Sequence, residues 1–475
     1  MKISVNIPDA VLRGEIEKVL GKAPGALIPQ AEMATLTKLD TRRYEISNLT
    51  GLEFATNLKT LYLRSIDVLD LTPLKNLMNL ETLNFRGADV LDITPLAHLT
   101  NLKRLYLEST DTSELSPLAH LANLETLNLS DTFVSDLSPL AHLANLKRLY
   151  LRGTDILDLT PLENLTNLET LNFRGADVLD ITPLAHLTNL KRLYLESTDI
   201  SELSPLAHLT NLETLSLGFT SVSDLSPLEN LTNLKTLNLR GTDILDLTPL
   251  ENLTELRSLY LSSTISEIKI KSSSDITIDL REIASEAKKK IKQAILRLAK
   301  ESGLSDKELE EAAKSINGVS NAVETVTKQE NAASNEKQET VKTSEEYASD
   351  ITPLSNLANL ERLTLSSTSV SDITPLSNLT ELQSLYLRFA SVSDITPLSN
   401  LTNLEYLNLS DTDISDIGPL ENLTNLERLY LCDTSVSDIT PLSNLTNLEY
   451  LNLSDTDISD ITPLSNLTKL QIYWE

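Results

Sequence analysis

A fixed period of 22 residues constrains the fold of this chain more than any other feature of its sequence. Proline followed by leucine recurs in steps of 22, with prolines at positions 73, 95, 117, 139, 161, 183, 205, 227 and 249, and again at 353, 375, 397, 419, 441 and 463. Counting back, Gly51 and Pro29 occupy the same phase, which gives eleven units, a gap and six further units. Such a period predicts a solenoid, because each unit can bury its apolar side chains only against its neighbours.

The unit around Pro73 indicates the local structure. Leu83 and Phe85 lie two residues apart, the spacing of a strand with one buried face. Leucines from Leu74 onward are three residues apart, which fits a 3₁₀ helix, and Thr72 is expected to cap that helix with proline at its first position. We therefore predict an α/β-type repeat solenoid: a leucine-rich-repeat arc with a parallel concave sheet, a short 3₁₀ or helical convex side, and an inserted segment.

The consensus L-x-x-L-x-L-x-x-T-x-I-x-D-I-x-P-L-x-x-L resembles the 22-residue repeats of bacterial internalin-type proteins. The segment from Pro8 to Leu20 resembles the helical N-terminal cap of that family. The resemblance implies a protein-binding scaffold that holds its partner on the concave sheet. The asparagine column of the family is occupied here mostly by threonine, at Thr110, Thr132, Thr154, Thr198, Thr242, Thr368 and Thr412.

Four regions follow from the period and its interruption. We expect a helical cap over residues 1–28, eleven repeats over 29–268, an inserted helical segment and disordered linker over 269–347, and six repeats over 348–475, the last one truncated. The segment Ile265-Ser-Glu-Ile268 before the gap has the same phase as Ala348-Ser-Asp-Ile351 after it, which indicates that the insertion interrupts one coil. We therefore expect one continuous solenoid, with the strand at Ser258–Ser262 paired to the strand at Arg362–Ser366.

Composition excludes several classes of function. The formal net charge of −28 argues against a nucleic-acid binder, which needs a basic surface, and against docking on anionic lipid. We expect no secretory signal in the opening residues and no membrane span, because no apolar run is long enough. One cysteine, Cys432, excludes an internal disulfide and a multi-cysteine metal site. No catalytic constellation or phosphate-binding loop can be assembled, so we expect no enzyme and no cofactor.

Several polar columns have a structural and a functional interpretation. The five histidines, at positions 98, 120, 142, 186 and 208, share a column with asparagine and are expected to be solvated convex residues rather than metal ligands. Asp70, Asp92, Asp136, Asp158, Asp180, Asp224 and Asp246 form another column. We expect each of these carboxylates to bond the turn backbone, with calcium binding as the alternative. A column that alternates Lys and Glu from Lys59 to Lys235 is expected to fix the stacking of neighbouring strands.

Tyrosine and arginine gather in the columns that flank the buried strand leucines. Nine of the twelve tyrosines and eleven of the seventeen arginines fall there. Such a concentration of arginine and tyrosine on one face of an acidic protein requires an explanation. In the N-terminal array they supply the predicted binding residues Tyr62, Arg64, Arg86, Arg104, Tyr106, Arg148, Tyr150, Arg152, Arg174, Arg192, Tyr194, Arg240 and Tyr260. Tyrosine and arginine are enriched at protein interfaces. The structural alternative is that tyrosine suits strands and that copying of blocks, such as the identical Leu80–Asp111 and Leu168–Asp199, multiplied one accident.

The sequence thus favours a non-catalytic scaffold that recognises an acidic or mixed-charge protein on its concave sheet. We expect the N-terminal array to dominate binding, because the outer concave column of the C-terminal array is mostly small or polar, at Ser366, Ser410, Cys432 and Ser454. The alternatives are a structural spacer, or the recognition part of a larger signalling or enzymatic protein whose active domain lies outside this chain.

Overall fold

The computed structural model describes residues 4–64, 70–87, 90–262 and 349–474. The chain divides into two units, the first formed by residues 1–264 together with 344–475 and the second by residues 265–343. All described residues belong to the first unit. The predicted insert at 269–347 lies outside the described residues, so its helical and linker character stays a prediction.

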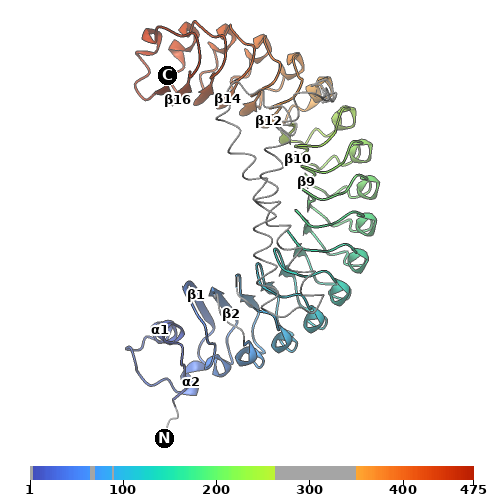
Figure 1. The fold of residues 1–475 in the computed structure, drawn as a ribbon, viewed down its shortest axis with the longest axis vertical. Coiled ribbons are helices and arrows are strands. Elements are labelled where there is room, and N and C mark those ends of the chain that lie inside the picture. The colour runs from blue at the N-terminus through green and yellow to red at the C-terminus, as the bar shows by residue number, and fades with distance from the viewer. Residues whose placement is uncertain (1–3, 65–69, 88–89, 263–348, 475) are drawn as a thin grey trace, which may run out of the picture. The chain divides into compact units, whose positions relative to one another are not determined.

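Each coil consists of a short strand on the inner, concave side and a 3₁₀ helix on the outer, convex side (Figure 1). The strands are β1 (Lys38–Glu45), β2 (Thr60–Arg64), β3 (Thr82–Asn84), β4 (Arg104–Tyr106), β5 (Thr126–Asn128), β6 (Arg148–Tyr150), β7 (Thr170–Asn172), β8 (Arg192–Tyr194), β9 (Thr214–Ser216), β10 (Thr236–Asn238), β11 (Ser258–Tyr260), β12 (Arg362–Thr364), β13 (Ser384–Tyr386), β14 (Tyr406–Asn408), β15 (Arg428–Tyr430), β16 (Tyr450–Asn452) and β17 (Gln471–Tyr473). Seventeen strands in one sheet confirm the predicted repeat solenoid.

The convex side is built from one-turn 3₁₀ helices that mostly begin with Thr-Pro-Leu or Ser-Pro-Leu. They are η1 (Leu52–Phe54), η2 (Thr72–Leu74), η3 (Thr94–Leu96), η4 (Ser116–Leu118), η5 (Ser138–Leu140), η6 (Thr160–Leu162), η7 (Thr182–Leu184), η8 (Ser204–Leu206), η9 (Ser226–Leu228), η10 (Thr248–Leu250), η13 (Thr352–Asn356), η14 (Thr374–Leu376), η15 (Thr396–Leu398), η16 (Gly418–Leu420), η17 (Thr440–Asn444) and η18 (Thr462–Leu464). Proline fits the start of each helix because its missing N–H would have no partner there.

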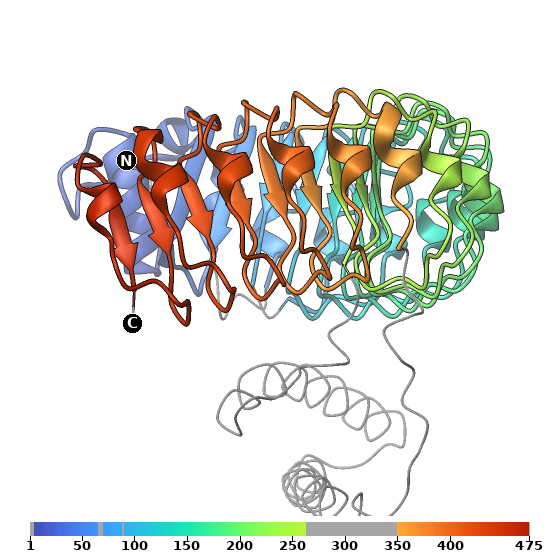
Figure 2. The same cartoon turned by 90° about the horizontal axis from the view of Figure 1, so that it is seen from above.

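Neighbouring strands run parallel, in sequence order, as Figure 2 shows from above. The register places leucine beside leucine, for example Leu83 beside Leu105 and Leu105 beside Leu127. These strand leucines are fully buried, and so are the leucines of the convex turns. The core is therefore a stack of apolar columns that runs through the coils, as the 22-residue period predicts.

The two repeat arrays form one continuous sheet. β11 pairs with β12 in parallel, with Ser258 beside Arg362 and Leu259 beside Leu363. The Asn359 side-chain amide also donates to the Thr254 carbonyl at 2.9 Å, across the same junction. The prediction that these strands pair is confirmed, and the insertion leaves the leucine columns in phase.

Two helices close the N-terminal end of the core. Helix α1 (Ala10–Val19) begins after Asp9, whose carboxylate accepts hydrogen bonds from the backbone of Val11 and Leu12, a normal N-terminal cap. The second oxygen of Asp9 accepts from Ser47 N–H at 2.9 Å, which ties this helix to the first coil. Helix α2 (Gln30–Met33) is a single turn that precedes β1.

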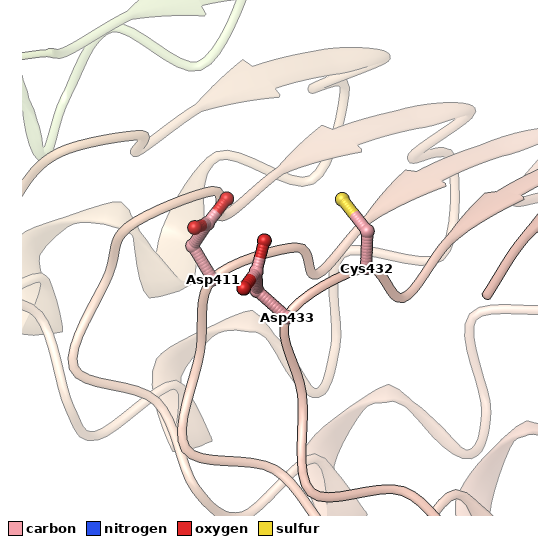
Figure 3. A group of neighbouring side chains, drawn as sticks. All are labelled: Asp411, Cys432 and Asp433. Carbon is pink, nitrogen blue, oxygen red and sulfur yellow. The ribbon is translucent and has the colours of Figure 1, made fainter. Parts of the chain in front are cut away.

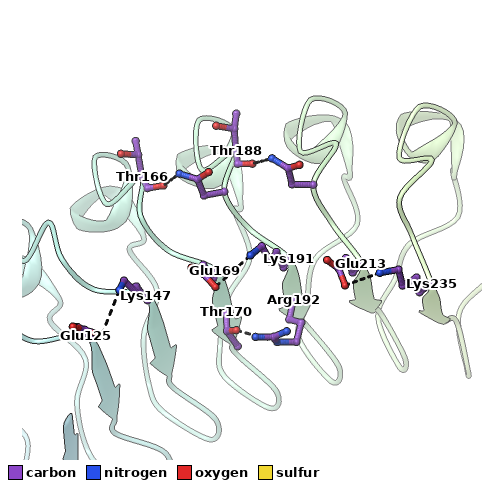
Figure 4. Close-up of polar contacts among 12 residues, drawn as sticks. Glu125, Lys147, Thr166, Glu169, Thr170, Thr188, Lys191, Arg192, Glu213 and Lys235 are labelled. Atoms are coloured by element: carbon purple, nitrogen blue, oxygen red, sulfur yellow. Dashed lines mark hydrogen bonds and ion pairs between the residues drawn. The ribbon is translucent and has the colours of Figure 1, made fainter. Parts of the chain in front are cut away.

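Asparagine, not threonine, makes the hydrogen-bond ladder between coils. A convex asparagine in most coils donates its side-chain amide to a carbonyl 23 residues earlier, as Asn189 does to Thr166 at 2.8 Å (Figure 4). The threonine column bonds locally instead, since Thr154 donates its hydroxyl to the Leu151 carbonyl three residues earlier. Threonine at the position where the internalin-type repeats carry asparagine thus leaves the hydrogen bonds between coils intact, because a different asparagine, present in most coils, makes those bonds.

The aspartate column bonds the turn backbone, as predicted. Asp70 accepts a hydrogen bond from the Thr72 N–H at 2.8 Å, and the Thr72 hydroxyl, followed by this N–H, lowers the pKa of Asp70. The same 2.8 Å bond is made by Asp92, Asp136, Asp158, Asp180, Asp224 and Asp246. The prediction that Thr72 caps the 3₁₀ helix is wrong, because Thr72 is the first helical residue and donates its N–H to the carboxylate of Asp70.

Deletion of residues 269–347 should leave the thermal transition of the solenoid within a few degrees. The deletion leaves ten residues between Leu261 and Ile351, where an intact coil has seven between Leu239 and Leu247, so the turn can still close. Circular dichroism melts of the full chain and the deletion variant measure this. A large loss of cooperativity would show instead that the insert contributes to the core.

Acid should destabilise the solenoid through the aspartate column. Because these carboxyls have a lower pKa when folded than when unfolded, they stabilise the fold above the unfolded value, and that stabilisation is lost as pH falls through the lowered folded values. We expect the free energy of unfolding to fall between about pH 5 and pH 2. Urea titrations across this range measure it. Replacing Asp158 and Asp180 with asparagine keeps an acceptor oxygen but removes the titration, so the acid slope should become shallower.

Candidate protein-binding surface

The concave face is formed by the side chains on either side of each buried strand leucine. In β4, Leu105 is buried, Arg104 is exposed and Tyr106 is half-buried. The same alternation recurs in β6 and β8, where the arginines and tyrosines are half-buried around a buried leucine. The predicted placement of these residues on the concave face therefore follows from the two-residue period of a strand.

Neighbouring coils hold the arginines of the first concave column in place. The Arg104 Nε donates to the Thr82 hydroxyl at 3.0 Å, and Arg148 bonds Thr126 in the same way. Arg192 repeats the contact with Thr170 at 3.2 Å, which is drawn in Figure 4. A guanidinium has five N–H donors, and this contact uses one of them, so each group is oriented with donors left for a ligand.

The next arginine column is paired with acids but stays accessible. Arg86 lies 3.2 Å from Glu108 and Arg174 lies 3.8 Å from Glu196, while the arginine side chains are 68% and 59% exposed. Arg240 places its guanidinium 5.0 Å from the centre of the Tyr260 ring, and Arg42 lies 4.6 Å from that of Tyr62. Arg152 is exposed. The side chain of Arg64 lies outside the described part of the chain.

The alternating Lys and Glu column pairs across coils as predicted. Lys103 lies 3.0 Å from Glu81, and Lys235 lies 3.1 Å from Glu213. Figure 4 shows the equivalent contacts of Glu125, Glu169 and Glu213, each with the lysine of the next coil. Each pair joins two neighbouring coils next to an arginine contact, so the pairs reinforce the register of the N-terminal sheet.

The C-terminal array carries a ladder of stacked tyrosines that was not predicted from the sequence. Ring centres of consecutive members lie 4.6, 5.3, 4.9 and 4.9 Å apart, with interplanar angles of 31–35°, along Tyr386, Tyr406, Tyr430, Tyr450 and Tyr473. We call these five residues the tyrosine ladder. Burial, followed by the neighbouring Tyr430 and Tyr386, raises the pKa of Tyr406. The ladder alternates between the third and first residues of successive strands, so no single column in the sequence reveals it.

The last member joins the ladder through a change of register. A 22-residue period would place Tyr473 beside Leu451, at a core position. The structure pairs Leu451 with Ile472 instead, and Tyr473 lies beside Asn452 on the concave face. Ile472 packs against the core while the Tyr473 side chain is 52% exposed. Burial of the aliphatic side chain thus overrides the period, because a shift of one residue exchanges the two faces of a strand.

Among the residues that the structure describes, three potential metal-ligand atoms meet within 4.8 Å only at Asp411, Cys432 and Asp433 (Figure 3). Asp411 already pairs with Arg388 at 2.9 Å. Burial raises the pKa of the Cys432 thiol, which disfavours the thiolate that a metal would need. Within the described ranges the carboxylates of the aspartate column form no such group, and the five histidines are exposed convex residues. No helix in the described part of the chain is long and apolar enough to cross a membrane.

Cys432 should react slowly in the folded protein. Its half-buried thiol has a raised pKa, and the thiolate is the reactive form. We expect a maleimide dye at neutral pH to modify it several-fold more slowly in the native chain than in the urea-unfolded chain. A Cys432→Ser variant should give no signal, since this is the sole cysteine. Equal rates in both states would contradict the burial of the thiol.

Comparisons with known proteins place the repeats in a family. The family described as Leucine Rich repeats (2 copies) matches residues 100–142, 188–230 and 402–444. A comparison with curated proteins gives no match. Internalin C2 of Listeria monocytogenes is 36% identical over 43% of this chain and 91% of its own, with a TM-score of 0.42. The functional domain of InlJ from the same organism is 17% identical over 96% of this chain and 83% of its own, with a TM-score of 0.62.

A plant receptor has a similar fold. The peptide hormone receptor RGFR1, solved in complex with RGF2, is 16% identical over 93% of this chain and 67% of its own, with a TM-score of 0.54. Proteins built from these repeats are typically non-catalytic scaffolds for the recognition of other proteins. With its 22-residue coils, parallel concave sheet and 3₁₀ convex side, the chain belongs to the leucine-rich-repeat proteins of the internalin type.

Proposed function

We propose that the concave sheet binds a partner protein through the tyrosines and arginines of the N-terminal array, which we call the N-terminal lane. It comprises Tyr62, Arg64, Arg86, Arg104, Tyr106, Arg148, Tyr150, Arg152, Arg174, Arg192, Tyr194, Arg240 and Tyr260. The observation that carries the proposal is that the described side chains of this lane flank the buried leucines and are not part of the core. Leu149 is fully buried, while the flanking Arg148 and Tyr150 are only half-buried and contribute nothing to the leucine columns.

The chemistry of the lane suits an acidic or mixed-charge protein surface. Arginine binds carboxylates through paired N–H donors, and tyrosine supplies a rigid apolar ring with a hydroxyl at its tip. The threonine contacts hold the guanidinium groups in one orientation before a partner arrives, which lowers the entropy lost on binding. Ten strands from β2 to β11, each about 4.8 Å from the next, give a lane about 43 Å long. That length accommodates an interface of ordinary size.

The peptide complex of the plant receptor supports recognition of polypeptides by this kind of fold, although it identifies no partner for the present chain. The spacer alternative makes a different prediction. If the array only separates other parts of a protein, then removal of concave side chains should leave every interaction of the chain unchanged. The two interpretations therefore differ in the effect of concave substitutions.

Substitution at the middle of the lane should weaken partner binding more than tenfold. Tyr150→Ala with Arg148→Ala removes one ring and one guanidinium, and central anchors of this kind typically contribute about 2 kcal/mol or more. Proteins captured by the wild-type chain and lost from this variant would be identified, and each would be titrated by calorimetry. Thermal melts should be nearly unchanged, because neither side chain belongs to the core.

Two matched variants control this experiment. His142→Ala with His186→Ala changes exposed convex residues and should bind as the wild type does. Tyr430→Ala with Arg428→Ala changes the equivalent strand positions in the C-terminal array, and we expect it to matter less for this partner. Equal or reversed effects of the two concave pairs would contradict the assignment, and no loss from either would favour the spacer.

A further inference from the structure

The C-terminal concave face differs in chemistry from the N-terminal lane. In the N-terminal array the tyrosines of β4, β6 and β8 are separated by strands that carry asparagine at the same position. In the C-terminal array the five rings of the tyrosine ladder are in direct contact from β13 to β17. The ladder therefore offers a continuous aromatic strip on the concave face, in which four rings are half-buried and Tyr473 is exposed.

A row of glutamates runs beside the tyrosine ladder. Glu405, Glu427 and Glu449 directly precede β14, β15 and β16, and all three are exposed. The equivalent column in the N-terminal array alternates Lys with Glu and forms ion pairs. Within the described ranges, these three glutamates have no ion pair of 4.0 Å or less. Like charges on neighbouring strands destabilise a sheet, so a cation bound from outside would relieve the repulsion within this row.

The other charges nearby leave the surface acidic. Arg428 and Lys469 line the same shallow hollow as Tyr430, Tyr450 and Glu449, and Arg388 is already paired with Asp411. Residues 348–475 contain 18 aspartates and glutamates but only four lysines and arginines. The field of this array therefore attracts cations, and the two basic residues of the hollow do not reverse it.

The sheet itself shows how a cation would sit on these rings. Arg42 lies over Tyr62 and Arg240 lies over Tyr260, with 4.6 and 5.0 Å between guanidinium and ring centre. In the part of the chain that the structure describes, no arginine or lysine occupies that position over the tyrosine ladder. The ladder thus presents the same aromatic acceptor without the cation that accompanies it elsewhere.

We propose that the tyrosine ladder and the three glutamates bind an extended arginine- or lysine-rich segment of a partner protein. Guanidinium groups would stack on the rings, and the carboxylates of Glu405, Glu427 and Glu449 would pair with neighbouring cationic side chains. Four steps of about 4.8 Å give a strip about 19 Å long. An extended chain advances about 3.3 Å per residue, so the strip matches about six residues.

This surface is independent of the N-terminal lane, because it lies on other strands and selects the opposite charge. The two proposals can therefore fail separately. A fluorescein-labelled hexa-arginine peptide is the probe, and binding is followed by anisotropy and by the fluorescence of Trp474. That residue is the only tryptophan, is 42% exposed, and directly follows the last member of the ladder. Saturable binding that alters both signals is expected, because the probe should lie beside Trp474.

The first comparison separates the rings from net charge. Tyr406→Ser, Tyr430→Ser and Tyr450→Ser together leave the charge of the protein unchanged and should weaken binding at least about tenfold. The matched set Tyr106→Ser, Tyr150→Ser and Tyr194→Ser should leave it within about twofold, because those rings are not stacked into a strip. Phenylalanine at the three ladder positions keeps the rings and should retain most of the affinity.

The second comparison tests the carboxylates with variants of exposed residues, which preserve the fold. Glu405→Gln, Glu427→Gln and Glu449→Gln should weaken binding several-fold and flatten its salt dependence. Glu163→Gln, Glu229→Gln and Glu251→Gln remove the same charge from exposed convex positions and should have little effect. Equal losses from the two glutamate sets, or no loss from the serine set in the ladder, would overturn the proposal and show only attraction to an acidic protein.

Discussion

Contact between buried leucines of neighbouring coils is the interaction on which every other part of this protein depends. Most strands have three residues and most 3₁₀ helices have three, so no element is long enough to be stable alone. In the described ranges between Leu58 and Leu453, the leucines of the strands and of the convex 3₁₀ turns are almost completely buried, whereas loop leucines such as Leu91 and Leu157 are exposed. Each coil therefore gains its stability from the coil before and the coil after it, and the hydrogen-bonded ladders align what the leucines hold together.

This mode of stabilisation leaves the concave face free to vary. In the three-residue strands, only the middle residue belongs to the apolar core, so the chemistry of the residues on either side can vary. In the N-terminal array they form oriented arginines and alternating ion pairs. In the C-terminal array they form stacked rings beside a row of glutamates that make no ion pair within the described part of the chain. One scaffold thus presents two surfaces of opposite chemical preference on the same sheet.

Features that repeat within one coil could be predicted from the sequence. The strand leucines, the 3₁₀ turns, the Asp70 contact with its turn and the pairing of β11 with β12 all follow from residue spacing. The helix cap at Thr72 was predicted wrongly, because Thr72 is itself the first helical residue and the residue spacing does not show whether the helix begins at the threonine or at the proline after it. The asparagine ladder was missed because its carbonyl partners belong to the preceding coil.

By itself, the sequence determined the number of coils, the order of the strands and the identity of the core residues, because these depend on a period that runs along the chain. Only the tertiary structure decided the contacts between different columns of adjacent strands. Tyr386 and Tyr406 stack because one ends its strand and the other begins the next. Tyr473 completes the ladder because Ile472 takes the core position and shifts the last strand by one residue. The register shifts because Ile472 and Tyr473 compete for the buried position, and the repeat period does not show which of the two side chains is buried.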